Sequence, residues 1–398
     1  MAEEKATGAL IEVGWVLAGD LDAQEVDAIR RARELVLRTL QALLPEFEWR
    51  MPVVYRRRIV QAQRVQPVHL LDAAASERAV RRWDFALLVT DAELVSYYTP
   101  WAMGMASRAL GSAVMSLARL EPSYSAEARA PVDRIAQRLQ RLALHLIGHL
   151  NGLPHAEDDR TSLLSPVGAA SDLDKMEAFS GEALDRLRCE LRDVADLRLE
   201  EQPGPRLGPV PFYAKTLRHN RDDIWSSVRQ IAPWWFPLRF SRLTIAGIST
   251  MLILLLTAEA WDLAMTQQLG FVLVFAAVSV AGTSAFLIKR QRLLVRRGGR
   301  RLTEQTAVTN ISVAVSIFIG MLTTWLLFFL FALAFSQAFF TDRLAASWAE
   351  DVGVPIGLRH YVVLSAFVAT LGIVIGGLGA SFEAESYFRH VAYVDEET

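Results

Sequence analysis

The sequence predicts two parts of different fold class, a mixed α/β (α+β) N-terminal domain and an all-α transmembrane domain. Two observations carry this prediction. Of the 398 residues, 52% are hydrophobic, and nearly all of the excess over an ordinary soluble protein follows Arg239. Before Arg239, short apolar runs alternate with amphipathic helical patterns, which is typical of a mixed sheet covered by helices. The length of the chain suits about two domains.

The N-terminal domain, residues 1–198, is expected to alternate strands and helices. Its apolar runs are bounded by charged or polar residues, as buried strands usually are, and two longer stretches repeat apolar residues at helical spacing. The expected strands are 9–18, 53–59, 85–90 and 113–117, and the expected helices are 23–44 and 131–152. Pro131 suits the first turn of the last helix, and Gly152 suits its C-terminal cap.

Composition and charge exclude several classes of function. The net charge is −2, whereas a surface that binds nucleic acid is usually basic, so no nucleic-acid partner is expected. The single cysteine, Cys189, excludes an internal disulfide and a cysteine-based zinc site. The N-terminus is acidic where a signal peptide is basic, so we expect the first domain not to be exported. Most basic residues are arginine, which suggests a bacterial origin.

Residues 199–242 are expected to link the two domains. They begin with a stretch rich in proline and glycine, and they continue with Trp225, Trp234 and Trp235 among several arginines. Aromatic rings and basic side chains both favour the headgroup region of a bilayer. We therefore expect an interfacial helix here, and a plain aromatic linker is the alternative.

Residues 243–398 are expected to form the transmembrane domain. Four apolar segments are long enough to cross a bilayer, which takes about 20 residues, and they lie at about 243–261, 269–288, 308–335 and 361–382. The basic run Lys289–Arg301 lies between the second and third segments, and short basic loops stay on the cytoplasmic side. The even number of spans predicts a multi-pass protein of the cell (inner) membrane with both termini in the cytoplasm.

The expected spans contain no charged residue at mid-depth, which argues against a transport path. Gly372, Gly376 and Ala380 place small residues on one face of the last span, a pattern typical of close helix packing. This face could pack within the four-helix domain or against a second copy of the chain. A homo-oligomer formed through the membrane helices therefore stays open.

Three of the seven histidines fall in one short stretch, His145, His149 and His155. On a helix the first two are one turn apart, so both imidazoles project from the same face and can hold one metal ion. Gly152 allows the chain to leave the helix and turn, which brings His155 back as a third ligand. Three imidazoles with an open fourth position are typical of a catalytic zinc site. The alternative is a relic that no longer binds metal.

The spacing of the three histidines is that of the metzincin motif H-E-x-x-H-x-x-G-x-x-H, and the surrounding sequence resembles the archaemetzincin family. The matching landmarks are Ile11–Gly14, Thr90–Asp91, Gly104, Ala106, Ser116–Leu120 and Ser171–Phe179. The resemblance covers residues 9–190 and none of the membrane half. It implies a metzincin-like fold in which His145, His149 and His155 are the zinc ligands.

The sequence departs from this family at three points. Leu146 stands where the family has the glutamate that acts as general base, and leucine cannot transfer a proton. The family also has a cysteine-rich second zinc site after the third histidine, and the matching stretch here has no cysteine. Leu164 stands where a methionine turn would form the floor under the metal. The resemblance therefore implies one zinc site with an altered floor and no general base.

Glu157, Asp158 and Asp159 follow the third histidine directly. One of them could close the fourth metal position, which would make the site structural, or could serve as a surrogate base. The alternative is that three consecutive acids form a solvated loop.

These observations predict a membrane-tethered pseudoprotease, which keeps the zinc site and binds a peptide or protein partner without cutting it. Two other functions stay open. The chain could be an active zinc metallopeptidase that uses a different base. It could also be a membrane scaffold or sensor with a metal-free N-terminal domain.

Overall fold

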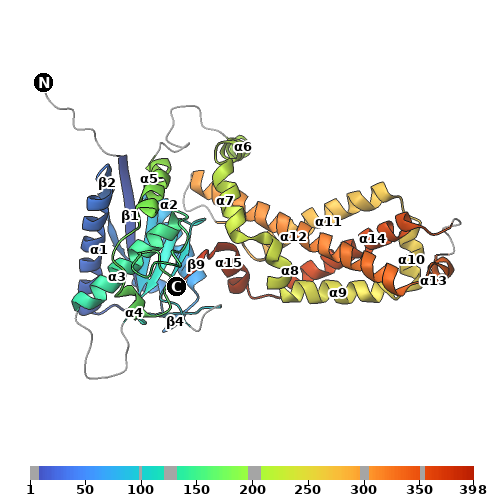
Figure 1. The fold of residues 1–398 in the computed structure, drawn as a ribbon, viewed down its shortest axis with the longest axis horizontal. Coiled ribbons are helices and arrows are strands. Elements are labelled where there is room, and N and C mark those ends of the chain that lie inside the picture. Colours follow the sequence, from blue (N-terminus) through green and yellow to red (C-terminus); the bar gives the residue numbers. More distant parts are fainter. Residues whose placement is uncertain (1–8, 98–100, 121–131, 196–207, 296–303, 350–354) are drawn as a thin grey trace. The chain divides into compact units, whose positions relative to one another are not determined.

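The computed structural model describes residues 9–97, 101–120, 132–195, 208–295, 304–349 and 355–398 (Figure 1). The chain forms two compact units that do not follow sequence order. The first consists of Met1–Asn220, Arg296–Thr309 and Arg389–Thr398, and the second of Arg221–Val295 and Asn310–Phe388. This division differs from the expected order of 1–198, 199–242 and 243–398 because the chain returns twice to the first unit.

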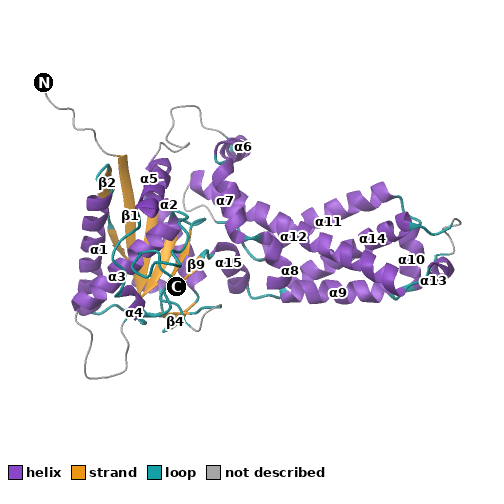
Figure 2. Cartoon of the chain, viewed as in Figure 1, coloured by secondary structure: helices purple, strands orange, loops and turns teal. Residues whose placement is uncertain are grey.

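A seven-stranded mixed sheet forms the centre of the first unit (Figure 2). The strand order is β2-β1-β5-β8-β7-β9, and β3 also pairs with β1. Strands β1, β5 and β8 are parallel, whereas β7 runs antiparallel to β8, and β9 runs antiparallel to β7. The strands are β1 (Ala9–Ala18), β2 (Phe47–Arg50), β3 (Val53–Tyr55), β5 (Phe85–Thr90), β7 (Gly104–Ser107), β8 (Ser112–Ser116) and β9 (Glu396–Glu397).

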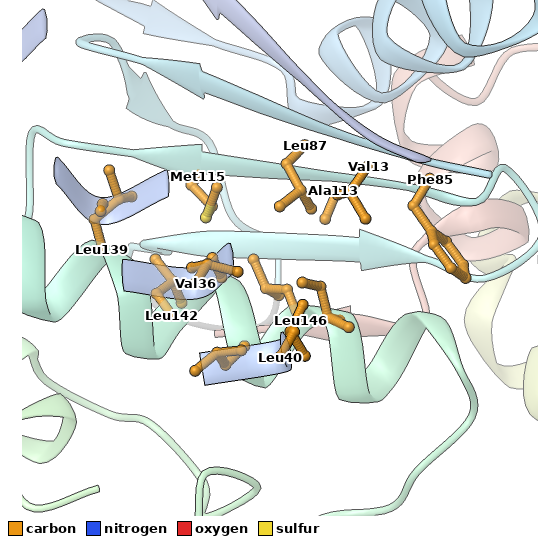
Figure 3. Packing of buried hydrophobic residues seen from close by; sticks show 14 of the residues in the cluster. Val13, Val36, Leu40, Phe85, Leu87, Ala113, Met115, Leu139, Leu142 and Leu146 are labelled. Atoms are coloured by element: carbon orange, nitrogen blue, oxygen red, sulfur yellow. The ribbon is translucent and has the colours of Figure 1, made fainter. Parts of the chain in front are cut away.

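The central strands β5 and β8 are buried along their whole length because helices cover both faces of the sheet. One face packs against α1 (Ala23–Leu43) and α3 (Val132–Leu150), and Figure 3 shows Leu87 and Ala113 of the sheet against Leu142 and Leu146 of α3. The helix α2 (Pro67–Arg81) also contacts the sheet, because the hydroxyl of Ser112 in β8 donates a hydrogen bond to the carbonyl of Leu71 in α2. The remaining elements of this unit are η1 (Arg57–Ile59), β4 (Arg64–Val65), β6 (Glu93–Leu94), α4 (Ala170–Leu173), α5 (Gly181–Ala195) and α6 (Pro209–His219).

The mixed α/β class of the N-terminal region is confirmed, and the longest expected elements lie where the sequence predicted them. The expected strand 53–59 is wrong beyond Tyr55, because Arg57–Ile59 turn into a 3₁₀ helix. The sequence did not predict β2, β7, β9 or α2. Pro131, expected in the first turn of α3, lies outside the described residues, as do parts of the linker and of the basic run.

The second unit is helical, and three of its described helices are long and apolar enough to cross a membrane. They are α11 (Leu269–Arg290), α12 (Glu304–Phe339, with the apolar part starting at Thr306) and α14 (Leu358–Ala380). Shorter helices complete the unit and its connections: α7 (Arg221–Ile231), η2 (Pro233–Trp235), α8 (Phe236–Arg239), α9 (Ser241–Leu255), α10 (Ala258–Met265), α13 (Asp342–Trp348) and α15 (Glu385–Tyr393).

The expected first span, 243–261, does not form one helix, so the count of four spanning helices is not confirmed. The helix α9 ends at Leu255, and Thr257 has extended backbone before α10 begins. At 1.5 Å per residue, the 15 residues of α9 reach about 22 Å, less than the roughly 30 Å of a bilayer core. A fourth crossing would need the pair Ile224–Arg239 and Ser241–Leu255, which is bent by 48°.

The small-residue face of α14 packs inside the chain. A Cβ added at Gly376 would lie 2.8 Å from the carbonyl oxygen of Leu243, and one added at Gly372 would lie 2.8 Å from the Met251 side chain. Both neighbours belong to α9, so the glycines allow the two helices to approach closely. This contact accounts for the pattern within one chain.

Candidate metal centre

The C-terminal end of α3 presents the first two histidines and then redirects the chain. The Leu153 N–H donates to the carbonyl of Gly148 at 3.1 Å, and the Gly152 N–H donates to that of His149 at 2.9 Å. Together with a φ of 73° at Gly152, these bonds form a Schellman motif, in which a glycine adopts the left-handed conformation at low cost. The turn returns His155 toward the helix.

The three imidazoles of His145, His149 and His155 lie together, as the motif predicts. The Nε2 atoms of His145 and His149 are 3.1 Å apart. The ring of His155 has its centroid 5.5 Å from that of His145 and 4.6 Å from that of His149. His145 and His149 are buried and His155 is partly buried.

Backbone groups fix the orientation of two rings. Nδ1 of His145 donates to the carbonyl of Leu163 at 2.8 Å, which leaves the lone pair on Nε2 facing the centre. The ring of His149 hydrogen-bonds the backbone of Leu153. Such partners hold metal-ligating histidines in the required tautomer. Leu164, which follows Leu163, is buried, and its side chain packs against Gly148 on the helix that carries His145 and His149.

Burial keeps the two helix histidines neutral. Burial and, to a lesser extent, the neighbouring His149 ring lower the pKa of His145 to about 3. Burial also lowers the pKa of His149 to about 4. Both rings are therefore unprotonated near pH 7, which is the state that a metal ion binds.

The fourth group of the cluster is Glu396 of β9, which the sequence did not predict. One ligand atom from each of His145, His149, His155 and Glu396 lies within 4.8 Å of every other. Oε1 of Glu396 is 3.3 Å from Nε2 of His155. That nitrogen is buried and has no hydrogen-bond partner among the described residues.

The three acids that follow His155 are not part of this cluster. Oδ1 of Asp159 accepts hydrogen bonds from the backbone and hydroxyl of Thr161, which makes it a turn-forming residue. Glu157 lines a pocket with Arg160 and Lys175. A carboxylate does lie beside the histidines, but it belongs to β9 and not to the three acids that follow His155.

Leu146 occupies the position where a general base is expected. Its side chain is completely buried and belongs to the core between α3 and the sheet (Figure 3). A Cβ added at Gly104 of β7 would lie 3.0 Å from Cδ1 of Leu146, so the leucine packs directly on the backbone of the strand next to β9.

The donor set and the spacing fit a zinc ion. Zinc prefers nitrogen and carboxylate oxygen ligands at about 2.0–2.2 Å, which places neighbouring ligands of a tetrahedron roughly 3.4 Å apart. The separations of 3.1 Å and 3.3 Å come within a few tenths of this value. The buried Nε2 of His155 would gain the partner that it lacks.

About half of the chain is similar in structure to archaemetzincins. The archaemetzincin of Methanopyrus kandleri is 17% identical over 48% of this chain and 99% of that one, with a TM-score of 0.37. The archaemetzincin of Archaeoglobus fulgidus, in complex with malonate, is 16% identical over 44% of this chain and 99% of that one, with a TM-score of 0.32. A zinc-dependent peptidase from Methanocorpusculum labreanum is 19% identical over 44% of this chain and 99% of that one, with a TM-score of 0.34.

No protein-family model and no curated protein matches the sequence. What the site can do therefore follows from its own residues.

Proposed function

We propose that the first unit is a zinc-binding module of the metzincin type that binds a peptide or protein partner and does not cleave it. One observation on α3 supports this proposal. The helix carries the two metal ligands His145 and His149, and the residue between them where a general base is expected is the buried Leu146. When bound, zinc would supply a Lewis acid for a carbonyl or a bound water. Hydrolysis also needs a group that takes up and returns a proton, and Leu146 has none.

A second candidate function is a zinc peptidase that uses an unusual base. Glu396 favours it, because its carboxylate is the group of the cluster that could accept a proton. A carboxylate that coordinates the metal is less available as a base, and it also fills the position that a water would need. The first function therefore accounts better for the site.

We also propose that the module is tethered to the membrane and faces the cytoplasm. Three helices of the second unit are apolar enough to cross a bilayer. The first of these helices ends with the basic residues Lys289 and Arg290, and Arg292 follows it. Basic connections of this kind stay in the cytoplasm. Because Arg296–Thr309 belongs to the first unit, the site lies on the same side as this connection.

The first experiment is elemental analysis of the full chain, purified in detergent, together with the double variant His145→Ala/His149→Ala. We expect about one zinc per wild-type chain and none in the variant, since two of the four donors are removed. His69→Ala is the matched control, because His69 lies on an exposed face of α2 in the same unit. A wild-type chain that takes up no zinc would disprove the metal site.

The non-catalytic assignment is tested with the zinc-loaded chain and a mixture of peptides. We expect no hydrolysis above that of the double variant. Cleavage that disappears in His149→Ala would instead support the peptidase.

A further inference from the structure

Residues 389–398, which return from the second unit, add a strand to the sheet of the first unit beside the histidines. Strand β9 pairs antiparallel with β7, with Ala106 opposite Glu396 and Met105 opposite Glu397. The pairing continues on both sides of β9. The Asp395 N–H donates to the carbonyl of Ala106 at 3.0 Å, and Gly104 and Thr398 exchange two hydrogen bonds of 2.9 Å each. The segment thus occupies the edge that an extended peptide would use.

Buried side chains hold this segment in place. Arg389 forms a 2.5 Å ion pair with Asp72 of α2, and Tyr393 is completely buried. The Arg108 N–H donates to the carboxylate of Asp395 at 2.5 Å. Glu397 contacts the buried His390 at 3.0 Å. These contacts are too specific for a loosely attached tail, so the segment is an integral part of the first unit.

One acidic side chain of the cluster is largely buried. The side chain of Glu396 is only 16% exposed, and its Oε1 lies 3.3 Å from Nε2 of His155. Burying a carboxylate without a cation is costly, whereas a divalent ion bound by the same four side chains balances it. Thr398 donates to Oε1 of Glu396 at 3.2 Å and so orients the carboxylate.

We propose that Glu396 is the fourth zinc ligand and that the metal locks residues 389–398 onto the edge of β7. The proposal rests on the zinc site proposed above and adds its regulation. Three imidazoles and one carboxylate close the coordination sphere, as in a structural site. The edge of β7 then becomes available to an extended peptide only when the segment leaves. Because the two events share one ligand, zinc stabilises the docked segment, and the docked segment tightens zinc binding to the same extent.

The test combines zinc affinity with hydrogen exchange on the full chain in detergent. In the wild type, removing zinc with a chelator should speed exchange at the amides of residues 395–398 and of Met103 and Gly104, which donate to Thr398. In Glu396→Gln, zinc should bind at least about tenfold more weakly, since even residues that merely support a ligand are worth about 10–100-fold. Zinc should also no longer slow exchange at these amides.

Glu182→Gln on α5 is the control, because it removes an exposed acid of the first unit and leaves the four proposed ligands and the contacts of residues 389–398 in place. We expect it to keep wild-type zinc affinity and zinc-dependent protection. If wild type binds zinc but Glu396→Gln binds it equally well, and zinc does not affect exchange at 395–398, the lock is disproved while the three-histidine site stands. If wild type binds no zinc, the site itself is disproved. The wild-type measurement with and without chelator needs no variant to fold.

Discussion

The side chain at position 146 bears on both the chemistry and the stability of the first unit. Leu146 lies next to a metal ligand in sequence, but it points into the core, where it packs on the backbone of Gly104. A carboxylate placed there would lose its hydration without meeting a cation. The local packing therefore opposes the restoration of a general base by a single substitution.

Leu146→Glu should accordingly destabilise the first unit without creating a peptidase. We expect a loss of about 3 kcal/mol or more, from the buried carboxyl group and the lost apolar contacts. Leu146→Met is the control and should cost less than about 1.5 kcal/mol, because it conserves volume. The measurement is the melting temperature of the full chain in detergent. Equal melting temperatures for the two variants would show that position 146 is open to solvent.

A second prediction concerns the buried Arg138 and its partner Asp174. Arg138 is 3% exposed, bonds both carboxylate oxygens of Asp174 at 2.9 Å and 2.6 Å, and donates to the carbonyl of Leu120. The hydrogen bonds from Arg138 hold the pKa of Asp174 below its ordinary value of 3.8. A lowered folded-state pKa stabilises the protein above pH 3.8, and this stabilisation is lost as the pH falls through the folded-state value.

Asp174→Asn should therefore lower stability by about 1–3 kcal/mol at pH 7, since it leaves a buried guanidinium without its anion. The difference from wild type should shrink as the pH falls below 3.8. Asp185→Asn is the control. The carboxylate of Asp185 is 74% exposed in its pair with Arg188, so we expect an effect below about 1 kcal/mol. A difference that grows in acid would contradict the assignment. Melting temperatures across the pH range supply the data.

At the scale of elements, the end of α3 matters most, because one turn converts a helix into a three-ligand site. The Schellman bonds at Gly152 set the direction in which the chain leaves, and three residues later His155 reaches the other two rings. Conformational freedom is needed at this one glycine. A Cβ there would also lie 2.3 Å from the Arg108 guanidinium, the end of a flexible side chain that can move aside.

Gly152→Ala should lower stability by about 1 kcal/mol, from the left-handed backbone, and should weaken zinc binding by displacing His155. Gly181→Ala is the control, since a Cβ at the start of α5 meets nothing within 4 Å. We expect it to be neutral or slightly stabilising. Zinc titration and melting curves of both variants test this. Unchanged zinc affinity in Gly152→Ala would mean that another contact positions His155.

The same helix shows how far sequence alone can predict this site. Its three histidines and its glycine are close in sequence, and local geometry is enough to bring them together. Glu396 gives no such signal, because β9 has only two residues and its polar sequence resembles a loop. Thr398 and His145 meet although they lie 253 residues apart. A contact of this kind depends on the whole chain path, which periodicity and spacing do not encode.

At the scale of the whole molecule, the return of the chain restricts how it can cross a membrane. The segments before, between and after the apolar helices belong to one compact unit, so where these helices cross a bilayer the segments would have to lie on one side of it. Each excursion must then cross an even number of times. From Asn310 to Phe388, α12 and α14 supply two crossings. From Arg221 to Val295, α11 supplies one, so the bent pair that ends at Leu255 has to supply another.

An even number of crossings in each excursion predicts four crossings, although three of the described helices are individually long and apolar enough to cross. The number of crossings can be tested by labelling cysteines with a membrane-impermeant maleimide in vesicles of both orientations. The exposed native Cys189 reports the side of the first unit. In a Cys189→Ser background, the exposed positions Gln268→Cys, before α11, and Ser347→Cys, in α13, report the two distal connections.

Both introduced cysteines should label from the side opposite to Cys189. Gln268→Cys follows one predicted crossing and Ser347→Cys follows three, and an odd number of crossings ends on the opposite side. Ser347→Cys acts as the internal control, because the chain is back at the first unit at Arg296–Thr309 and the straight helix α12 then leads to Ser347. Labelling of Gln268→Cys from the Cys189 side would show that the bent pair re-enters without crossing. The chain could then return to the first unit at Arg296–Thr309 only if α11 also stays on that side, which its 22 largely apolar residues make costly.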